Sequence, residues 1–87
     1  MDIKISVACG IVLRQLRTEA GLTQEQLGFE ADLQRKYVSS LELGEKAPSL
    51  ETVLKLSAGL RVEAAKLVAL VCEEIERHAH ETKRLDT

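Results

Sequence analysis

The segment from residue 23 to residue 50 reads TQEQLGFEADLQRKYVSSLELGEKAPSL, and it contains two short helical patterns separated by a tight break. Thr23 is typical of a helix N-cap, and Gln26, three residues later, completes a capping box. The break at Asp32-Leu33 precedes a second helical pattern from Gln34 to Leu43, which Gly44 ends. Two short helices joined in this way predict a helix-turn-helix core at about residues 23–43.

Helical patterns also lie on both sides of this core. Apolar residues at helical spacing predict a helix from about Ile5 to Ala20, which Gly21 ends. After Pro48, which cannot continue a helix, Ser49 is typical of the N-cap of a helix that runs up to Gly59. We expect the buried side of that helix to consist of Leu50, Val53, Leu54 and Leu56.

The composition favours a small all-α domain. The chain has 87 residues, of which 45% are hydrophobic, 30% charged and only 2% aromatic. This balance excludes a disordered chain and a membrane protein, and Leu, Val, Ile and Ala have to fill the core. A last helical pattern starts near Glu63 and continues to about His80. We therefore expect a single five-helix domain over residues 1–87.

The net charge and the number of cysteines exclude several classes of protein. The formal net charge of −2 excludes a uniformly basic nucleic-acid coat, but it is compatible with a local basic patch. Cys9 and Cys72 are too few for a disulfide framework. The apolar run from Ile5 to Leu13 is too short to span a membrane and has no cleavage site before the domain. We expect a cytoplasmic protein with reduced thiols.

The motif residues, taken together, resemble the Cro/repressor-type, or XRE-like, helix-turn-helix family. The similar positions are Thr23–Leu27, Val38–Ser39, Leu41–Glu42, Gly44 and Pro48–Leu50, and the resemblance spans about residues 11–67. The segment Arg35–Glu42 looks particularly like the controller proteins of restriction–modification systems. The resemblance implies a five-helix, lambda-repressor-like DNA-binding domain with an extended C-terminal helix.

The second helix of the core is the candidate recognition helix. Such a helix brings the side chains of its first turn to base edges in the major groove, and Arg35 and Lys36 occupy that turn. Arg can bond O6 and N7 of a guanine together, and Lys can reach the same acceptors. Ser40, one turn later, is short enough to contact a base. The alternative is that Arg35 and Lys36 are ordinary solvated charges.

The resemblance also implies contacts with DNA phosphates at Gln24, Tyr37, Ser39 and Lys46. Gln24 begins a helix, where free backbone N–H groups favour an anion. Contacts of this kind set the register of the protein on DNA without reading its sequence. For Tyr37 there is an alternative, in which the ring covers the edge of the core and the hydroxyl stays in water.

Arg17 and Glu42 have a structural role in the resemblance. In the family, an Arg near the end of the first helix commonly pairs with a Glu at the end of the recognition helix, and this fixes the angle between the two.

Several positions depart from the family pattern. Gln34 is a weak N-cap, and Leu43 and Glu45 replace the common Asn and Lys. Phe29 stands where polar residues are usual, and it is either an addition to the core or an exposed contact. Of the two, we expect it to extend the core.

The C-terminal helix carries more apolar surface than a small core needs. We expect this surplus to form the twofold seam of a homodimer, because a dimer reads two half-sites about one helical turn apart. The alternative is a helix folded wholly back on its own domain. The expected seam residues are Val62, Leu67, Val68, Leu70 and Val71.

No motif in the sequence supports catalysis, a cofactor or a metal site. Glu73, Glu74 and Glu76 are interpreted as a solvated face. Two functions remain: a dimeric, sequence-specific regulator of transcription that binds a pseudo-palindromic operator in double-stranded DNA, and an antitoxin-like or adaptor module that binds a protein. A protein partner such as a toxin or RNA polymerase stays open in either case.

Overall fold

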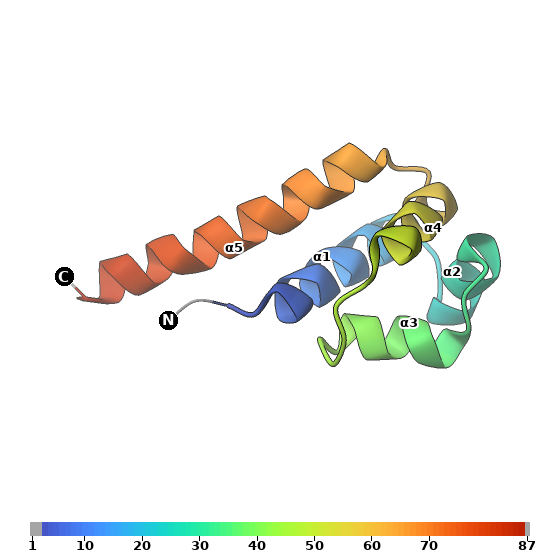
Figure 1. The fold of residues 1–87 in the computed structure, drawn as a ribbon, viewed down its shortest axis with the longest axis horizontal. Helices are drawn as coiled ribbons and strands as arrows, with labels where there is room; N and C mark the ends of the chain where they lie inside the picture. Colours follow the sequence, from blue (N-terminus) through green and yellow to red (C-terminus); the bar gives the residue numbers. More distant parts are fainter. Residues whose placement is uncertain (1–2, 87) are drawn as a thin grey trace.

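The computed structural model of the protein describes residues 3–86 and, at the C-terminal end, the side chains up to residue 79. These residues form five helices and no strand, which confirms the expected all-α class (Figure 1). The helices are α1 (Ile5–Glu19), α2 (Gln24–Ala31), α3 (Arg35–Glu42), α4 (Leu50–Leu60) and α5 (Ala64–Asp86). The last helix therefore extends beyond His80, where we expected it to end.

The ends of the first three helices follow the local signals in the sequence. The capping box at the start of α2 is confirmed, because the Gln26 N–H donates to Thr23 Oγ1 at 3.0 Å and the Thr23 N–H donates to Gln26 Oε1 at 2.8 Å. Gly21 follows α1 in a left-handed conformation with φ of +73°. Asp32 adopts the same conformation, with φ of 56°, and this residue turns the chain from α2 into α3.

The predicted end of α4 at Gly59 is wrong. The helix continues to Leu60, and Arg61 forms its left-handed cap with φ of 58°. Gly59 serves packing instead, since a Cβ at this position would lie only 3.1 Å from the Cβ of Ala31 on α2. The absent side chain lets α4 approach α2 closely.

The predicted buried side of α4 is wrong in two positions. Leu50 is 73% exposed and Leu54 is 52% exposed, whereas Leu56 is buried as expected. Thr52 and Ser57 take inward positions in their place, because local hydrogen bonds satisfy their hydroxyl groups. The exposed leucines leave an apolar surface on the outside of α4.

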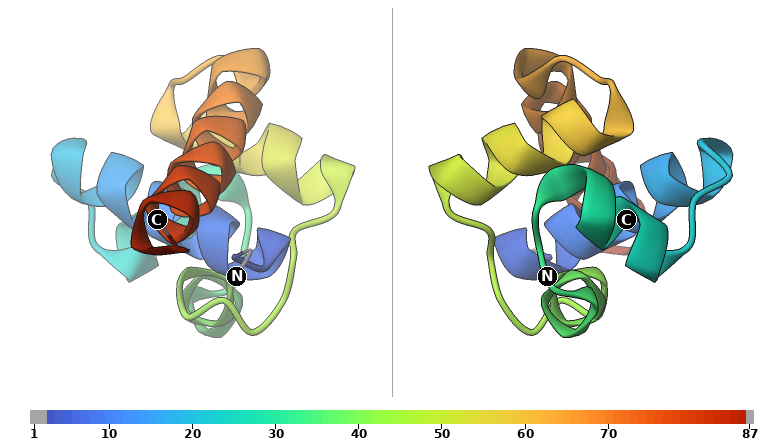
Figure 2. Two further views of the ribbon diagram at one scale, coloured as in Figure 1. Left: turned by 90° about the vertical axis from the view of Figure 1, so that its left-hand side faces the viewer. Right: turned by 90° about the vertical axis from the view of Figure 1, so that its right-hand side faces the viewer.

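The core lies around α1, which packs against both α3 and α5, while α2 packs against α3 and α4. Figures 1 and 2 both show α3 at an edge of the molecule, away from the start of α5. This placement leaves one side of α3 open to solvent. The buried apolar side chains are those of Ala8, Val12, Leu13, Leu27, Ala31, Val38, Leu41, Leu56, Leu60, Leu67 and Val71.

The expectation that Phe29 extends the core is wrong, since its side chain is 85% exposed. Leu27 and Ala31, two residues to either side, point inward and are buried. Each residue of an α-helix turns by about 100°, so a residue two positions away from a buried one lies on nearly the opposite face. Phe29 therefore projects outward from α2.

The inner side of α5 is also more deeply buried than expected. Glu74 is buried rather than solvated, although Glu73 and Glu76 are exposed. Hydrogen bonds from Arg77 and, more weakly, His78 hold the pKa of the Glu74 carboxyl below its ordinary value, against the opposing effect of burial.

Among the described residues, every helix is too short or too polar to span a membrane.

Candidate nucleic-acid interface

The first turn of α3 presents two positive charges to solvent. The inward face of this helix buries Val38 and Leu41, and Arg35 and Lys36 on the first turn are exposed. Neither cation forms an ion pair within the described part of the chain. Gln34 caps the helix without a side-chain hydrogen bond, which confirms the weak cap expected there. The tip of α3 is therefore accessible, charged and free to bind an acceptor.

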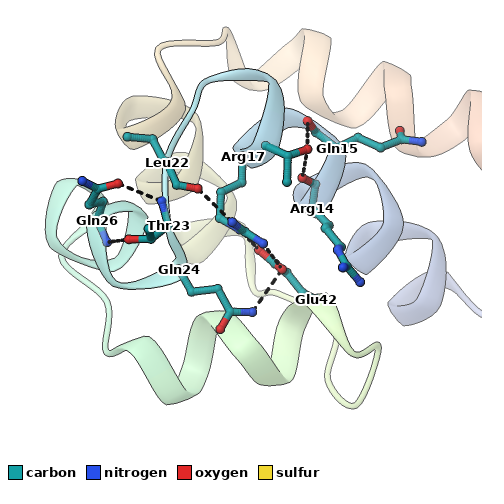
Figure 3. Close-up of polar contacts among 9 residues, drawn as sticks. Arg14, Gln15, Arg17, Leu22, Thr23, Gln24, Gln26 and Glu42 are labelled. Atoms are coloured by element: carbon teal, nitrogen blue, oxygen red, sulfur yellow. Dashed lines mark hydrogen bonds and ion pairs between the residues drawn. The ribbon is translucent and has the colours of Figure 1, made fainter.

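A buried ion pair holds α3 against α1, as the resemblance implied. Arg17 Nε lies 2.5 Å from Glu42 Oε2, and Arg17 Nη2 donates to Glu42 Oε1 at 3.0 Å. The side chains of Arg17 and Glu42 are only 13% and 4% exposed. The hydrogen bond with Glu42 raises the pKa of the Arg17 guanidinium. Arg17 Nη1 also donates to the carbonyl of Leu22 at 2.8 Å, so one side chain joins α1, the link to α2 and α3 (Figure 3).

Gln24 belongs to the same cluster, a contact that sequence reasoning missed. Its Nε2 donates to Glu42 Oε1 at 3.2 Å, and Figure 3 shows its amide oxygen turned away from Glu42. No local pattern signals this bond, because the two residues are 18 positions apart in the chain. The amide carries two N–H groups, so one remains for another acceptor. The backbone N–H groups of Gln24 and Glu25 at the start of α2 are also without a partner.

An open hollow of about 510 Å³ lies beside the exposed side of α3. Four of the residues expected to contact DNA line it, namely Lys36, Tyr37, Ser40 and Lys46. The other three, Arg35, Gln24 and Ser39, lie outside it. Its lining residues are Asp32, Leu33, Gln34, Lys36, Tyr37, Ser40 and Lys46.

Tyr37 lies at the edge of the core, as one of its two interpretations expected, although its hydroxyl has a neighbour in the protein. Its contact with a phosphate stays a prediction. The side chain is half-buried, and its hydroxyl lies 3.4 Å from Thr52 Oγ1 on α4, as expected of a ring at the edge of the core. Lys46 Nζ lies 5.9 Å from the centre of the same ring, which keeps this cation over the hollow. The ring therefore supports a positive charge at the surface that faces outward beside α3.

The expected seam residues divide into two groups. Leu67 and Val71 are buried in the core of the domain, because α5 packs this side against the other helices. Val68 is 46% exposed, and Val62 and Leu70 are half-buried. Only the second group presents apolar surface to solvent.

Comparison with protein families and sequences gives a consistent result. A family model described as helix-turn-helix matches residues 13–67. The control protein C.BamHI of Bacillus amyloliquefaciens is 36% identical over 69 residues, which cover 78% of this chain and 85% of that protein. The control protein C.MunI of a Mycoplasma species is 39% identical over 74 residues, which cover 84% of this chain and 97% of that protein.

Solved structures agree with this result. The restriction-modification controller protein C.AhdI from Aeromonas hydrophila matches with a TM-score of 0.69 and 44% identity, over 71% of this chain and 94% of that one. The clp gene regulator ClgR from Corynebacterium glutamicum matches over 99% of this chain and 92% of that one with a TM-score of 0.89, and its 22% identity supports the fold alone. The chain belongs to the Cro/repressor-type helix-turn-helix family of DNA-binding transcription regulators, whose members are not enzymes.

Proposed function

We propose that this protein binds a pseudo-palindromic operator in double-stranded DNA as a homodimer and thereby regulates transcription. The observation that carries the proposal is the exposed and unpaired start of α3, where Arg35 and Lys36 protrude while Val38 and Leu41 anchor the opposite face. A cationic tip on a rigid helix is suited to enter the major groove.

Arg35, Lys36 and Ser40 contact bases in this proposal. The guanidinium of Arg35 donates to O6 and N7 of one guanine, and Lys36 donates to a neighbouring acceptor. Ser40 lines the same hollow as Lys36, one turn further along α3, so it follows the groove in the direction of the helix axis. These contacts depend on base identity and provide the specificity.

Gln24, Tyr37, Ser39 and Lys46 contact phosphates in this proposal. Gln24 offers its second amide N–H together with the free backbone N–H groups at the start of α2, where the helix dipole favours an anion. Lys46 supplies a full positive charge above the ring of Tyr37. Such contacts contribute affinity that falls with salt.

The homodimer uses α4 and α5. A single recognition helix contacts only one half-site, whereas regulators of this kind gain specificity from two. The apolar side chains that remain outside the core on these neighbouring helices form the proposed seam. They are Leu50 and Leu54 on α4, Val68 on α5, and Val62 between the two helices. Leu70 is left out of the seam, because it lies two positions from Val68, on nearly the opposite face of α5, and lines a hollow with Val12 and Gln15 of α1.

A gel-shift titration with DNA duplexes at several salt concentrations tests the proposal. We expect a complex whose affinity falls steeply as the salt concentration rises, because phosphate contacts release counterions. A duplex selected from random sequences is expected to bind more tightly than unselected DNA. If no duplex binds at about micromolar protein concentration in moderate salt, the proposal is wrong.

Replacing Arg35 by alanine is expected to weaken binding to the selected duplex by about 1–3 kcal/mol and to relax base preference at one position of each half-site. Lys46→Ala is the matched comparison, since it also removes one exposed cation. It should weaken binding to all duplexes equally and reduce the salt slope by about one. Equal selectivity in both variants and the wild type would show that α3 does not read the bases.

Introducing a charge into the seam through Leu54→Glu is expected to convert the dimer into a monomer, because the dimer would have to bury an unpaired carboxylate. Sedimentation measures the change in mass, and affinity for the full operator should fall by about tenfold or more. Leu43→Glu is the control for the measurement of mass, since Leu43 is also exposed but lies at the end of α3, outside the proposed seam. A dimer that survives Leu54→Glu would place the seam elsewhere.

A further inference from the structure

Thr52 is a buried polar residue on α4, and its hydroxyl reaches the candidate recognition helix. The residue is only 7% exposed. Ser49 Oγ donates to Thr52 Oγ1 at 3.1 Å, and the hydroxyl oxygen of Tyr37 on α3 lies 3.4 Å from the same atom. Three hydroxyl groups therefore form a chain that connects the start of α4 to α3.

The donors and acceptors present determine the direction of the hydrogen bonds in this chain. A hydroxyl has one hydrogen to donate and two lone pairs that accept. Ser49 Oγ accepts from the N–H of Thr52 at 3.1 Å and gives its own hydrogen to Thr52 Oγ1. Among the described residues, Tyr37 Oη is then the one acceptor left for the hydroxyl hydrogen of Thr52. Because a buried donor without an acceptor is costly, Thr52 donates and Tyr37 accepts.

The phenol of Tyr37 keeps its own hydrogen for a partner outside the protein. Tyr37 lines the open hollow beside α3, together with Lys36, Ser40 and Lys46. Lys46 Nζ lies 5.9 Å from the centre of the ring, so the position of the ring also affects that of the cation. A contact that fixes the ring therefore fixes both a hydroxyl donor and a positive charge on this surface.

We propose that Thr52 is a positioning residue for DNA binding, which donates to Tyr37 and thereby directs the phenol hydrogen to a DNA phosphate and holds the ring beside Lys46. The inference rests on the proposed function, since it concerns two of the phosphate contacts named there. A phenol that donates to a phosphate becomes a better acceptor, so the contact of 3.4 Å with Thr52 strengthens when DNA binds. Thr52 acts through Tyr37, because its own side chain is buried.

A first test needs no DNA. Tyr37 is the one tyrosine of a chain that has no tryptophan, so tyrosine fluorescence reports on this ring alone. Thr52→Val keeps the shape of the side chain and removes the hydroxyl. We expect acrylamide to quench the fluorescence more strongly in this variant, because the hydroxyl of the ring is no longer held. Thr52→Ser keeps a hydroxyl and should restore wild-type quenching.

A second test measures affinity for DNA by gel shift. Thr52→Val is expected to weaken binding to selected and unselected duplexes alike by about threefold to tenfold, the effect of one hydrogen bond at a contact that does not read bases. In a Tyr37→Phe background the same substitution should cause no further loss, because Thr52 acts through the phenol. Thr52→Ser should restore the wild-type affinity.

Ser57→Ala is the matched control. Ser57 is also buried on α4, but its hydroxyl donates to the carbonyl of Leu54 in the same helix. The variant removes a buried hydroxyl without a change at α3, so both the quenching and the affinity for DNA should stay as in the wild type. Urea unfolding checks that each variant is folded. If Thr52→Val does not fold, Thr52→Ala takes its place in every comparison.

Three results would overturn the role of Thr52. The first is wild-type quenching or wild-type affinity in Thr52→Val, the second is a loss of affinity that adds to that of Tyr37→Phe, and the third is an equal loss in Ser57→Ala. A purely structural role would lower the midpoint of unfolding without the expected changes at Tyr37. If the wild type binds no duplex, the proposed function is wrong, whereas the quenching experiment still tests whether Thr52 holds the ring.

Discussion

Replacing Glu42 by alanine is expected to lower the free energy of unfolding by about 3–5 kcal/mol, the range for breaking a buried ion pair by removing one partner. The variant leaves the Arg17 guanidinium in its buried position without a counter-ion, and Gln24 loses the acceptor of its amide. Urea unfolding followed by circular dichroism measures the change, since the midpoint should fall without a change in slope.

A second variant distinguishes a stranded charge from a general defect in packing. Removing both charges through Arg17→Met with Glu42→Leu should recover most of the lost stability, because no buried charge then remains unpaired. Glu42→Gln keeps an acceptor for Gln24 and should be intermediate. If Glu42→Ala lost less than about 1 kcal/mol, the pair would behave as an ordinary surface ion pair.

Local chemistry made the start and turn of the helix-turn-helix predictable. The capping box of Thr23 and Gln26, and the left-handed glycines at positions 21 and 44, depend on residues close together in sequence. Backbone hydrogen bonding in these places requires particular side chains whatever the rest of the fold does. The sequence therefore predicted the position of α3, and with it the exposed tip.

The orientation of helices about their own axes was harder to predict. For α4 the apolar pattern suggested that Leu50 and Leu54 are buried, but the helix turns inward the side that carries Thr52 and Ser57. The hydrophobicity of Phe29 favours a place in the core, although its spacing from Leu27 and Ala31 places it outside. Hydrophobicity alone does not distinguish a core residue from an exposed apolar side chain.

The sequence predicted only some of the contacts between segments that are distant along the chain. The pair of Arg17 and Glu42 was expected from family resemblance, whereas the bond from Gln24 to Glu42 was not. This bond connects a proposed phosphate contact to the pair that holds α3 in place. The assembly of three polar side chains requires the three-dimensional arrangement of α1, α2 and α3, which no local pattern encodes.

Gly10 is the position where helix propensity and packing predict opposite results. Glycine in the interior of a helix is less stable than alanine by about 1 kcal/mol, so propensity alone predicts that Gly10→Ala stabilises α1. In the fold, however, a Cβ at this position would lie 2.6 Å from the carbonyl oxygens of both Leu41 and Glu42. Backbone atoms cannot rotate away as a flexible side chain would, so α1 and α3 have to move apart.

We expect packing to prevail and Gly10→Ala to lower the free energy of unfolding by about 1–3 kcal/mol, the range for inserting a group into a filled core. Thermal and urea unfolding measure the sign as well as the size of this effect. Gly21→Ala is the matched control, because a Cβ there meets no atom within 4 Å and only its φ of +73° opposes the substitution. Its cost should be about 1–2 kcal/mol and should leave the α1–α3 packing intact. Stabilisation by Gly10→Ala would mean that α1 and α3 do not approach so closely, and the orientation of Arg35 toward DNA would then have to be revised with it.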